Sequence, residues 1–215
     1  MFGINMDIVF LTLQRPFIWL IRFCYRFMYN VHSPFAFNLI TQVIYEKKPY
    51  YAYREVKIEE RKQVRLRGKG WIHESKKINR LLFRLVNMAQ PDTIVDVGTL
   101  SSSSLYLQAG KLSADYVSAS DLTELFLEKD VAIDFLYLHN DKNPALVEDV
   151  FQVCAGRIHQ QSVFVIEGIC YSKQMKNLWK RMIADDRVGV TFNLYYAGIL
   201  FFDKTKVKQH YKVCF

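Results

Sequence analysis

A strand, a capped helix and a second strand follow one another in the second half of the chain, and this unit restricts the fold more than any other feature. The two strand-like runs are residues 132–138 and 162–166. The stretch between them has Asn143 as N-cap, Pro144 at the first helical position and Gly156 just past the end. Such a unit predicts two parallel strands joined by a right-handed crossover. We therefore expect an α/β fold.

Further strand-like runs indicate how the sheet continues. Residues 93–97 form a short apolar run ended by Gly98, which is typical of a strand buried on both faces, and residues 116–120 form another run of strand length. Residues 188–194 and 199–202 are separated by only a few residues, which permits antiparallel but not parallel pairing. The sequence therefore predicts a mostly parallel sheet with a C-terminal antiparallel hairpin.

The first part of the chain is helical in pattern and basic in charge. Residues 46–84 contain 13 basic and 5 acidic residues, which accounts for the whole net charge of +8. This imbalance favours an anionic partner, namely nucleic acid, a phosphorylated metabolite or an anionic membrane surface. The alternative is an ordinary solvated helix surface. We expect a helical, basic N-terminal extension over residues 1–75 and an α/β domain over residues 76–215.

The N-terminal segment 8–29 is rich in aromatic and aliphatic residues but contains three arginines. No stretch of 18 uncharged apolar residues exists, so we predict no transmembrane helix. The segment is expected to be a helix that packs on its own domain or lies in a membrane interface. The four cysteines have no paired spacing, which indicates a reducing compartment. We therefore expect a cytoplasmic protein, with peripheral membrane contact as the alternative.

The predicted architecture resembles that of the class I S-adenosylmethionine-dependent methyltransferases, above all their small-molecule O-methyltransferase branch. Residues 94–99 (IVDVGT) look like the first motif of the family, 134–140 (DFLYLHN) like its fourth strand, 163–167 (VFVIE) like its fifth and 191–202 like its closing hairpin. Residues 31–35 (VHSPF) look like an extension found in a bacterial subgroup of methyltransferase-like proteins. The resemblance implies a three-layer, Rossmann-like sheet.

The same resemblance implies which residues would hold S-adenosylmethionine. They are Asp96, Gly98, Thr99, Ser101 and Ser102 for its methionine part, and Asp121 for its ribose. Two departures fall on this pocket. Serines at 101–104 replace the later glycines of the motif, and only about a dozen residues separate Asp121 from the next strand. The third strand, whose preceding loop holds the adenine in the family, is therefore expected to be missing or shortened.

The catalytic end departs from the family pattern as well. Asp141 and His139 follow the fourth strand, and either is the candidate base for methyl transfer. Together with Glu167 at the end of the fifth strand they could supply ligands for a divalent metal. We do not expect such a metal, because polar residues at strand ends commonly face solvent and an Asn-Asp pair is ordinary turn chemistry.

Two functions follow from these observations. The first is methyl transfer from S-adenosylmethionine to an unknown acceptor. The alternative is a non-catalytic pseudoenzyme that binds or scaffolds a partner through the basic segment or the N-terminal helix. Because the departures fall on the cofactor pocket while the core strands are intact, the sequence favours loss of chemistry over loss of fold. A nucleic-acid binder is a third reading, which no recognisable binding module supports.

Overall fold

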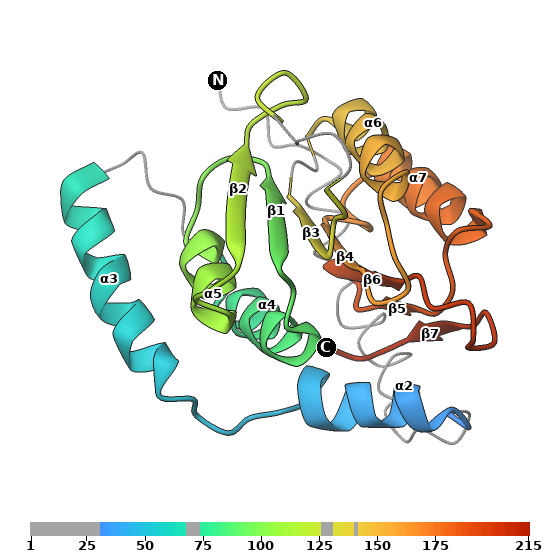
Figure 1. Ribbon diagram of the computed structural model, residues 1–215, viewed down its shortest axis with the longest axis horizontal. Coiled ribbons are helices and arrows are strands. Elements are labelled where there is room, and N and C mark those ends of the chain that lie inside the picture. Colours follow the sequence, from blue (N-terminus) through green and yellow to red (C-terminus); the bar gives the residue numbers. More distant parts are fainter. Residues whose placement is uncertain (1–30, 68–73, 126–130, 140–141) are drawn as a thin grey trace, which may run out of the picture.

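The computed structural model describes residues 31–67, 74–125, 131–139 and 142–215. Helices and strands alternate over most of this length, and their labels are those of Figure 1. The helices are α2 (Pro34–Asn38), the π-helix η2 (Leu39–Ile44), α3 (Ala52–Arg67), α4 (Lys76–Ala89), α5 (Ser103–Gly110), α6 (Pro144–Ala155) and α7 (Lys173–Ala184). The strands are β1 (Thr93–Val97), β2 (Asp115–Ala119), β3 (Phe135–Leu138), β4 (Val163–Glu167), β5 (Thr191–Asn193), β6 (Ala197–Phe201) and β7 (His210–Lys212).

All seven strands belong to one sheet in the order β2-β1-β3-β4-β6-β5-β7. The first four are parallel, while β6 pairs antiparallel with both β4 and β5. The predicted parallel sheet with its closing hairpin is therefore confirmed. The described chain also passes from β2 to β3 without another strand, in keeping with the expected loss or shortening of the third strand; residues 126–130 lie outside the described part.

Helices cover both faces of this sheet and give the predicted three layers (Figure 1). One apolar cluster joins α2, η2, α4 and part of α5 to one face, and a second joins α6 and α7 to the other. Successive side chains of a strand point to opposite faces and so belong to different clusters. In β1, Ile94 belongs to the first cluster, and Val95 and Val97 belong to the second. This alternation places Asp96 on the face that α4 and α5 cover.

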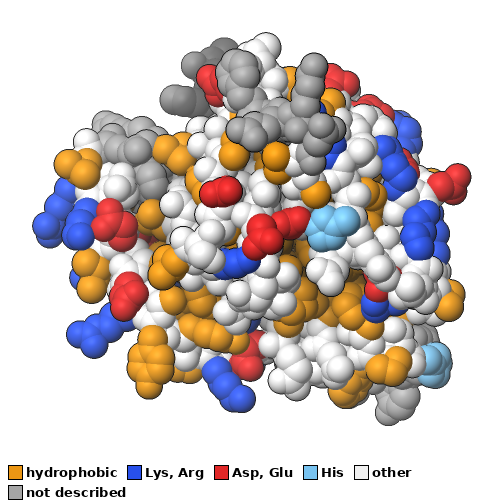
Figure 2. Space-filling view, in the orientation of Figure 1, with side chains coloured by type: hydrophobic (Ala, Val, Ile, Leu, Met, Phe, Trp, Pro, Cys, Tyr) orange, Lys and Arg blue, Asp and Glu red, His pale blue; other side chains and the backbone are white. Residues whose placement is uncertain are grey.

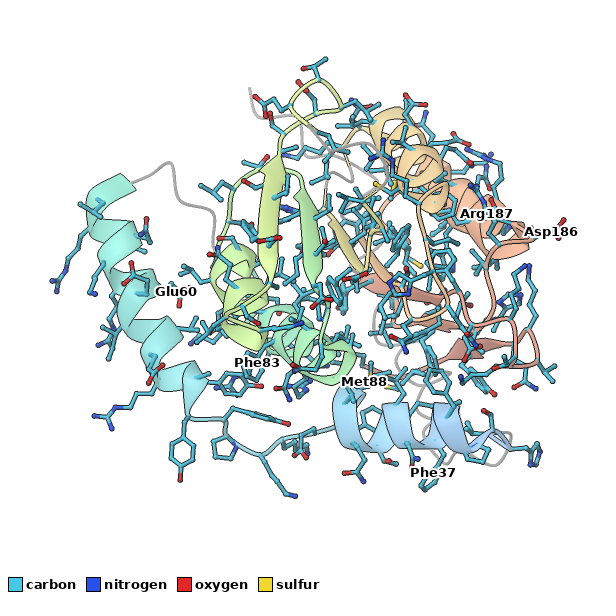
Figure 3. The ribbon with its side chains drawn as sticks, viewed as in Figure 1. Phe37, Glu60, Phe83, Met88, Asp186 and Arg187 are labelled. Atoms are coloured by element: carbon cyan, nitrogen blue, oxygen red, sulfur yellow. The ribbon has the colours of Figure 1, made fainter. Side chains whose placement is uncertain are left out.

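The capping residues explain several helix ends. Asn143 accepts a hydrogen bond from the Leu146 amide at 3.2 Å, with Pro144 at the first helical position, as the sequence predicts. Helix α4 begins after Ser75, whose hydroxyl accepts from the Lys77 amide. Phe83, labelled in Figure 3, lies on α4 in a small aromatic cluster at the foot of α3. Ring packing therefore holds the basic helix α3 against the domain.

Three elements were not predicted from the sequence. They are α5, which includes half of the serine run, the π-helical form of η2, and the edge strand β7, which pairs parallel with β5. The helix predicted over residues 8–29 lies outside the described part of the chain. None of the helices in the described ranges is long and apolar enough to cross a membrane.

Candidate functional site

The carboxyl edge of the sheet brings several predicted site residues together. β1 and β3 are neighbouring parallel strands, with Val97 opposite Leu138. The residues that follow them, Gly98 and His139, therefore leave the sheet side by side. The His139 amide donates a hydrogen bond to the Val97 carbonyl at 3.0 Å, which fixes this arrangement. The edge is the place where ligands bind in open α/β sheets.

The imidazole ring of His139 covers Gly98. A Cβ atom at position 98 would lie 2.6 Å from the ring, closer than non-bonded carbon atoms approach. The backbone of Gly98 also has φ = +153°, a conformation that residues with a side chain rarely adopt. The His139 side chain is only 6% exposed. Position 98 is therefore restricted to glycine by its backbone and by the ring above it.

Two carboxylates flank this ring. Its Nε2 atom lies 2.9 Å from Oδ1 of Asp96, and its Nδ1 atom lies 3.3 Å from Oε1 of Glu74. The ring also stacks on Tyr137, with 4.7 Å between the centroids. Burial disfavours the charged ring, but the hydrogen bonds and charges of Asp96 and Glu74 outweigh burial and raise the pKa of His139 to about 10. The imidazole is therefore protonated at neutral pH.

Hydroxyl groups take up the remaining carboxylate oxygens. The Tyr116 hydroxyl donates to Oδ2 of Asp96 at 2.5 Å. Glu74 accepts a hydrogen bond from the Ser101 hydroxyl at 2.5 Å, and the Tyr137 hydroxyl lies within hydrogen-bond distance of it at 3.0 Å. Burial raises the pKa of Glu74, but its hydrogen bonds and the nearby imidazolium outweigh burial and lower that pKa overall. Donors of the same chain thus already lie against both carboxylates.

The serine run is buried and its hydroxyls are engaged within the protein. Ser102 accepts hydrogen bonds from the Glu74 amide at 3.0 Å and from the Asn79 side chain at 2.8 Å. The Ser104 hydroxyl donates to the Ser101 carbonyl at 2.8 Å. The four serines are at most 3% exposed. Their hydroxyls therefore anchor the segment before α4 to the turn after β1.

The other predicted site residues form no hydrogen bond or ion pair with this cluster in the described part of the chain, or lie outside that part. Asp121 follows β2 and accepts three hydrogen bonds on one carboxylate oxygen, from the amide and hydroxyl of Thr123 and the amide of Glu124. It thereby closes its own turn, and the hydrogen bonds from Thr123 lower its pKa. Thr99 is exposed. Asp141, a predicted catalytic residue, lies outside the described part of the chain.

Sequence reasoning missed three residues of the cluster, namely Glu74, Tyr116 and Tyr137. The two tyrosines lie within strand-like runs, where an aromatic residue is ordinarily part of the core. Glu74 precedes the N-cap of α4 in a segment that otherwise carries positive charge. That isolated acidic residue beside a helix start was the one available signal. Its partner His139 is far away in sequence, so no local pattern joins them.

The described residues contain no arrangement of side chains suited to a metal ion. No group of three or more His, Cys, Asp or Glu side chains there is arranged to hold a metal ion. Glu167 ends β4, as predicted, and reaches the cluster through Tyr137, whose hydroxyl lies within hydrogen-bond distance of both Glu167 and Glu74. Within this part of the chain, His139 is committed to its ion pairs with carboxylates.

The fold is similar to that of known methyltransferases. A methyltransferase of Podospora anserina, solved with bound S-adenosylhomocysteine, matches with a TM-score of 0.54 at 9% sequence identity, over 80% of this chain and 97% of its own. A Staphylococcus aureus protein with a provisional caffeoyl-CoA O-methyltransferase assignment matches with a TM-score of 0.50 at 10% identity, over 68% and 91% of the two chains. No protein-family model and no curated protein sequence matches the chain. The two solved structures therefore show a methyltransferase-like fold for this chain.

Proposed function

We propose that this chain is a methyltransferase-fold protein whose cofactor edge is closed by its own side chains, and that it acts as a binding protein instead of transferring methyl groups. One observation carries the proposal: the ring of His139 rests on Gly98 between Asp96 and Glu74. In the resemblance drawn from the sequence, the space above this glycine receives the methionine part of the cofactor.

The space and the donor set at this edge do not fit S-adenosylmethionine. The cofactor carries two positive groups, its ammonium and its sulfonium, and would bring them to an edge whose two carboxylates already pair with an imidazolium. A second cation would have to compete with this imidazolium for the two carboxylates. The hydroxyls of Ser101 and Ser102 and one oxygen of Asp121 are engaged as well. These internal contacts support loss of the cofactor.

Methyl transfer is the second candidate function, and a specific observation favours it. Asp96 and Gly98 stand at the end of β1, and Asp121 stands just past the end of β2, which are the places that the resemblance assigns to cofactor contacts. Under this candidate the ring of His139 would have to leave Gly98. The protonated ring could not serve as the base, and that role would pass to Asp141.

Calorimetric titration with S-adenosylmethionine and S-adenosylhomocysteine separates the two candidates. The wild-type protein is expected to bind neither at millimolar concentration and to show no rise in melting temperature. Micromolar binding by the wild type would favour methyl transfer and reject the closed edge.

Two variants identify the cause. His139→Ala removes the ring and frees both carboxylates, so any gain of binding by this variant would assign the block to His139. The control is His159→Ala, which removes another histidine–carboxylate pair, with Asp134, at an exposed position away from Gly98. It is expected to behave as the wild type.

The proposal extends to partners and location. The basic segment 46–84 supports an anionic partner, and Figure 2 shows Lys and Arg side chains along the outer side of α3 at the left edge, with acidic ones among them. A membrane contact through residues 8–29 stays a prediction, since that segment lies outside the described part. We keep a cytoplasmic location as part of the proposal, because the cysteines have no paired spacing.

A further inference from the structure

A large cavity lies between the basic segment and the C-terminal end of the chain. Its volume is about 1150 Å³, more than enough for a small organic molecule. Three parts of the chain line it: the segment that follows η2, the first turns of α4, and a group of residues around the end of β4 and the chain end. Figure 1 shows the C-terminus beside α4, above the chain that leaves η2.

Positive charge dominates the lining. The cavity is lined by the six basic residues Lys47, Lys48, Lys76, Lys77, Arg80 and Arg84, and by two acidic side chains, Glu46 and Glu167. The Glu46 side chain accepts a hydrogen bond from the Lys48 amide at 2.6 Å, and the Glu167 side chain lies within hydrogen-bond distance of the Tyr137 hydroxyl. In the described ranges Glu46 forms no ion pair with a lysine of the cavity.

The basic residues of the cavity differ in whether other groups of the protein already contact them. Arg84 is buried and donates to the Val43 and Ile44 carbonyls, so it is part of the core. Arg80 lies over the ring of Tyr53 at 5.0 Å. In contrast, Lys47, Lys48 and Lys76 are exposed, and none forms an ion pair with another described residue. These three ammonium groups are the ones available to a ligand.

The start of α4 adds to the positive potential. Its first turn carries Lys76 and Lys77 and no acidic residue, although the N-terminus of a helix already has partial positive charge. Lys77 lies over the ring of Phe215 at 4.3 Å, and burial lowers its pKa. Like charges held together in this way repel one another. A bound anion would relieve that repulsion.

The rest of the lining is apolar and aromatic. Ile44 and Ile78 are buried beneath the cavity, and Phe215 borders it. Tyr171 and Tyr196 meet edge to face at 6.4 Å between their centroids on the side of β4. Such a lining suits a ligand with an apolar or aromatic body, while the lysines suit its charged group.

We propose that this cavity binds a small phosphomonoester with an apolar or aromatic body, its phosphate held by Lys47, Lys48 and Lys76. The inference rests on the proposed function, because it names the ligand class of a binding protein that does not use its cofactor edge. The cavity does not include His139 or Gly98. Its occupation can therefore be tested separately from that of the cofactor edge.

The test is calorimetric titration with phenyl phosphate at low salt, with benzyl alcohol as the uncharged counterpart. The wild type is expected to bind phenyl phosphate at millimolar concentration or below and to ignore benzyl alcohol. The triple variant Lys47→Gln/Lys48→Gln/Lys76→Gln is expected to lose at least tenfold in affinity. The control Arg54→Gln/Lys62→Gln/Lys180→Gln removes the same charge at exposed positions outside the cavity and is expected to stay within twofold.

Several outcomes would overturn the proposal. They are the absence of any binding by the wild type at 10 mM, and equal losses in the two triple variants, which would indicate diffuse charge attraction. Tighter binding of a single-stranded oligonucleotide that both variants weaken equally would assign the basic segment to nucleic acid. Melting curves of each variant identify losses due to unfolding. S-adenosylhomocysteine is titrated separately. Absence of phenyl phosphate binding would therefore not contradict the closed cofactor edge, and binding of S-adenosylhomocysteine would not contradict a phosphate site in the cavity.

Discussion

At the scale of single residues, the protonated state of His139 has a consequence for stability. The ring carries a pKa of about 10 in the folded protein, against an ordinary value of 6.5. A pKa raised by folding stabilises the native state fully below the unfolded value, and the contribution is lost as pH rises through the folded value. Glu74, whose pKa is lowered, acts in the opposite direction and loses its contribution as pH falls into the acid range.

The predicted result is a loss of stability between about pH 7 and pH 10 that depends on His139. Urea unfolding at several pH values measures it in the wild type and in His139→Gln, which keeps a polar side chain without the titration. The variant is expected to be less stable at pH 7 and to change less as pH rises. Parallel pH profiles for the two proteins would contradict a charged ring in the native state.

Gly98 permits a second prediction at this scale. Gly98→Ala places a methyl group 2.6 Å from the His139 ring and forces an alanine into a positive φ. The expected loss in the free energy of unfolding is about 1–3 kcal/mol from the backbone alone. Gly156→Ala is the control, because its φ is −77° and the added methyl group meets no atom closer than 3.3 Å. Similar costs for both variants would show that the ring does not restrict position 98.

The residue scale also shows what the sequence could predict of the site. Asp96, Gly98 and His139 end neighbouring strands, so their shared edge follows from strand order. The sequence predicted departures at the cofactor pocket because serines replace glycines there, but the position of the His139 ring over Gly98 could not be predicted. That contact depends on Glu74, which approaches from a separate segment before α4. Only the folded chain brings these groups together.

At the scale of elements, α4 ties the N-terminal segment to the domain. Arg84 is 6% exposed and donates to the Val43 carbonyl at 2.6 Å and to the Ile44 carbonyl at 3.3 Å. These carbonyls lie at the end of η2, and without Arg84 they would lack this side-chain donor. The buried guanidinium therefore connects two helices that are distant in sequence.

Arg84→Met is predicted to destabilise the protein by about 2–3 kcal/mol, because two carbonyls lose a charged donor while the side-chain volume is largely kept. Limited proteolysis should then cut more readily between residues 34 and 51. Arg80→Met on the same helix is the control, since Arg80 is exposed, and it is expected to cost well under 1 kcal/mol. Equal unfolding free energies for the two variants would remove the proposed role of Arg84.

The elements differ in how far the sequence predicts them. α6 was predicted because Asn143, Pro144 and Gly156 mark its ends. β7 has only three residues, none fully buried, so it shows no apolar run. α5 begins within the serine run, and serine favours turns and caps over helix interiors. Tertiary packing therefore determines that β7 and α5 form.

At the scale of the whole molecule, the sheet carries a helical layer on each face, and the His139 ring covers Gly98 at the edge that the resemblance assigns to the cofactor. The two apolar clusters run along both faces of the strands from β1 to β6, and α2 and η2 join one of them. This core depends on apolar periodicity, which the sequence retains. The cofactor edge depends on a few polar residues, and there the chain departs from the family pattern. Under the proposed function, the chain therefore keeps the fold without binding the cofactor.

The measurement that tests the closed edge most directly is the NMR spectrum of the histidine side chains, recorded against pH with and without millimolar S-adenosylhomocysteine. Of the five histidines in the chain, His139 is predicted to stay protonated to about pH 10, with signals that the ligand does not change. A His139 signal that titrates near pH 6.5, or that shifts when the ligand is added, would contradict the closed edge.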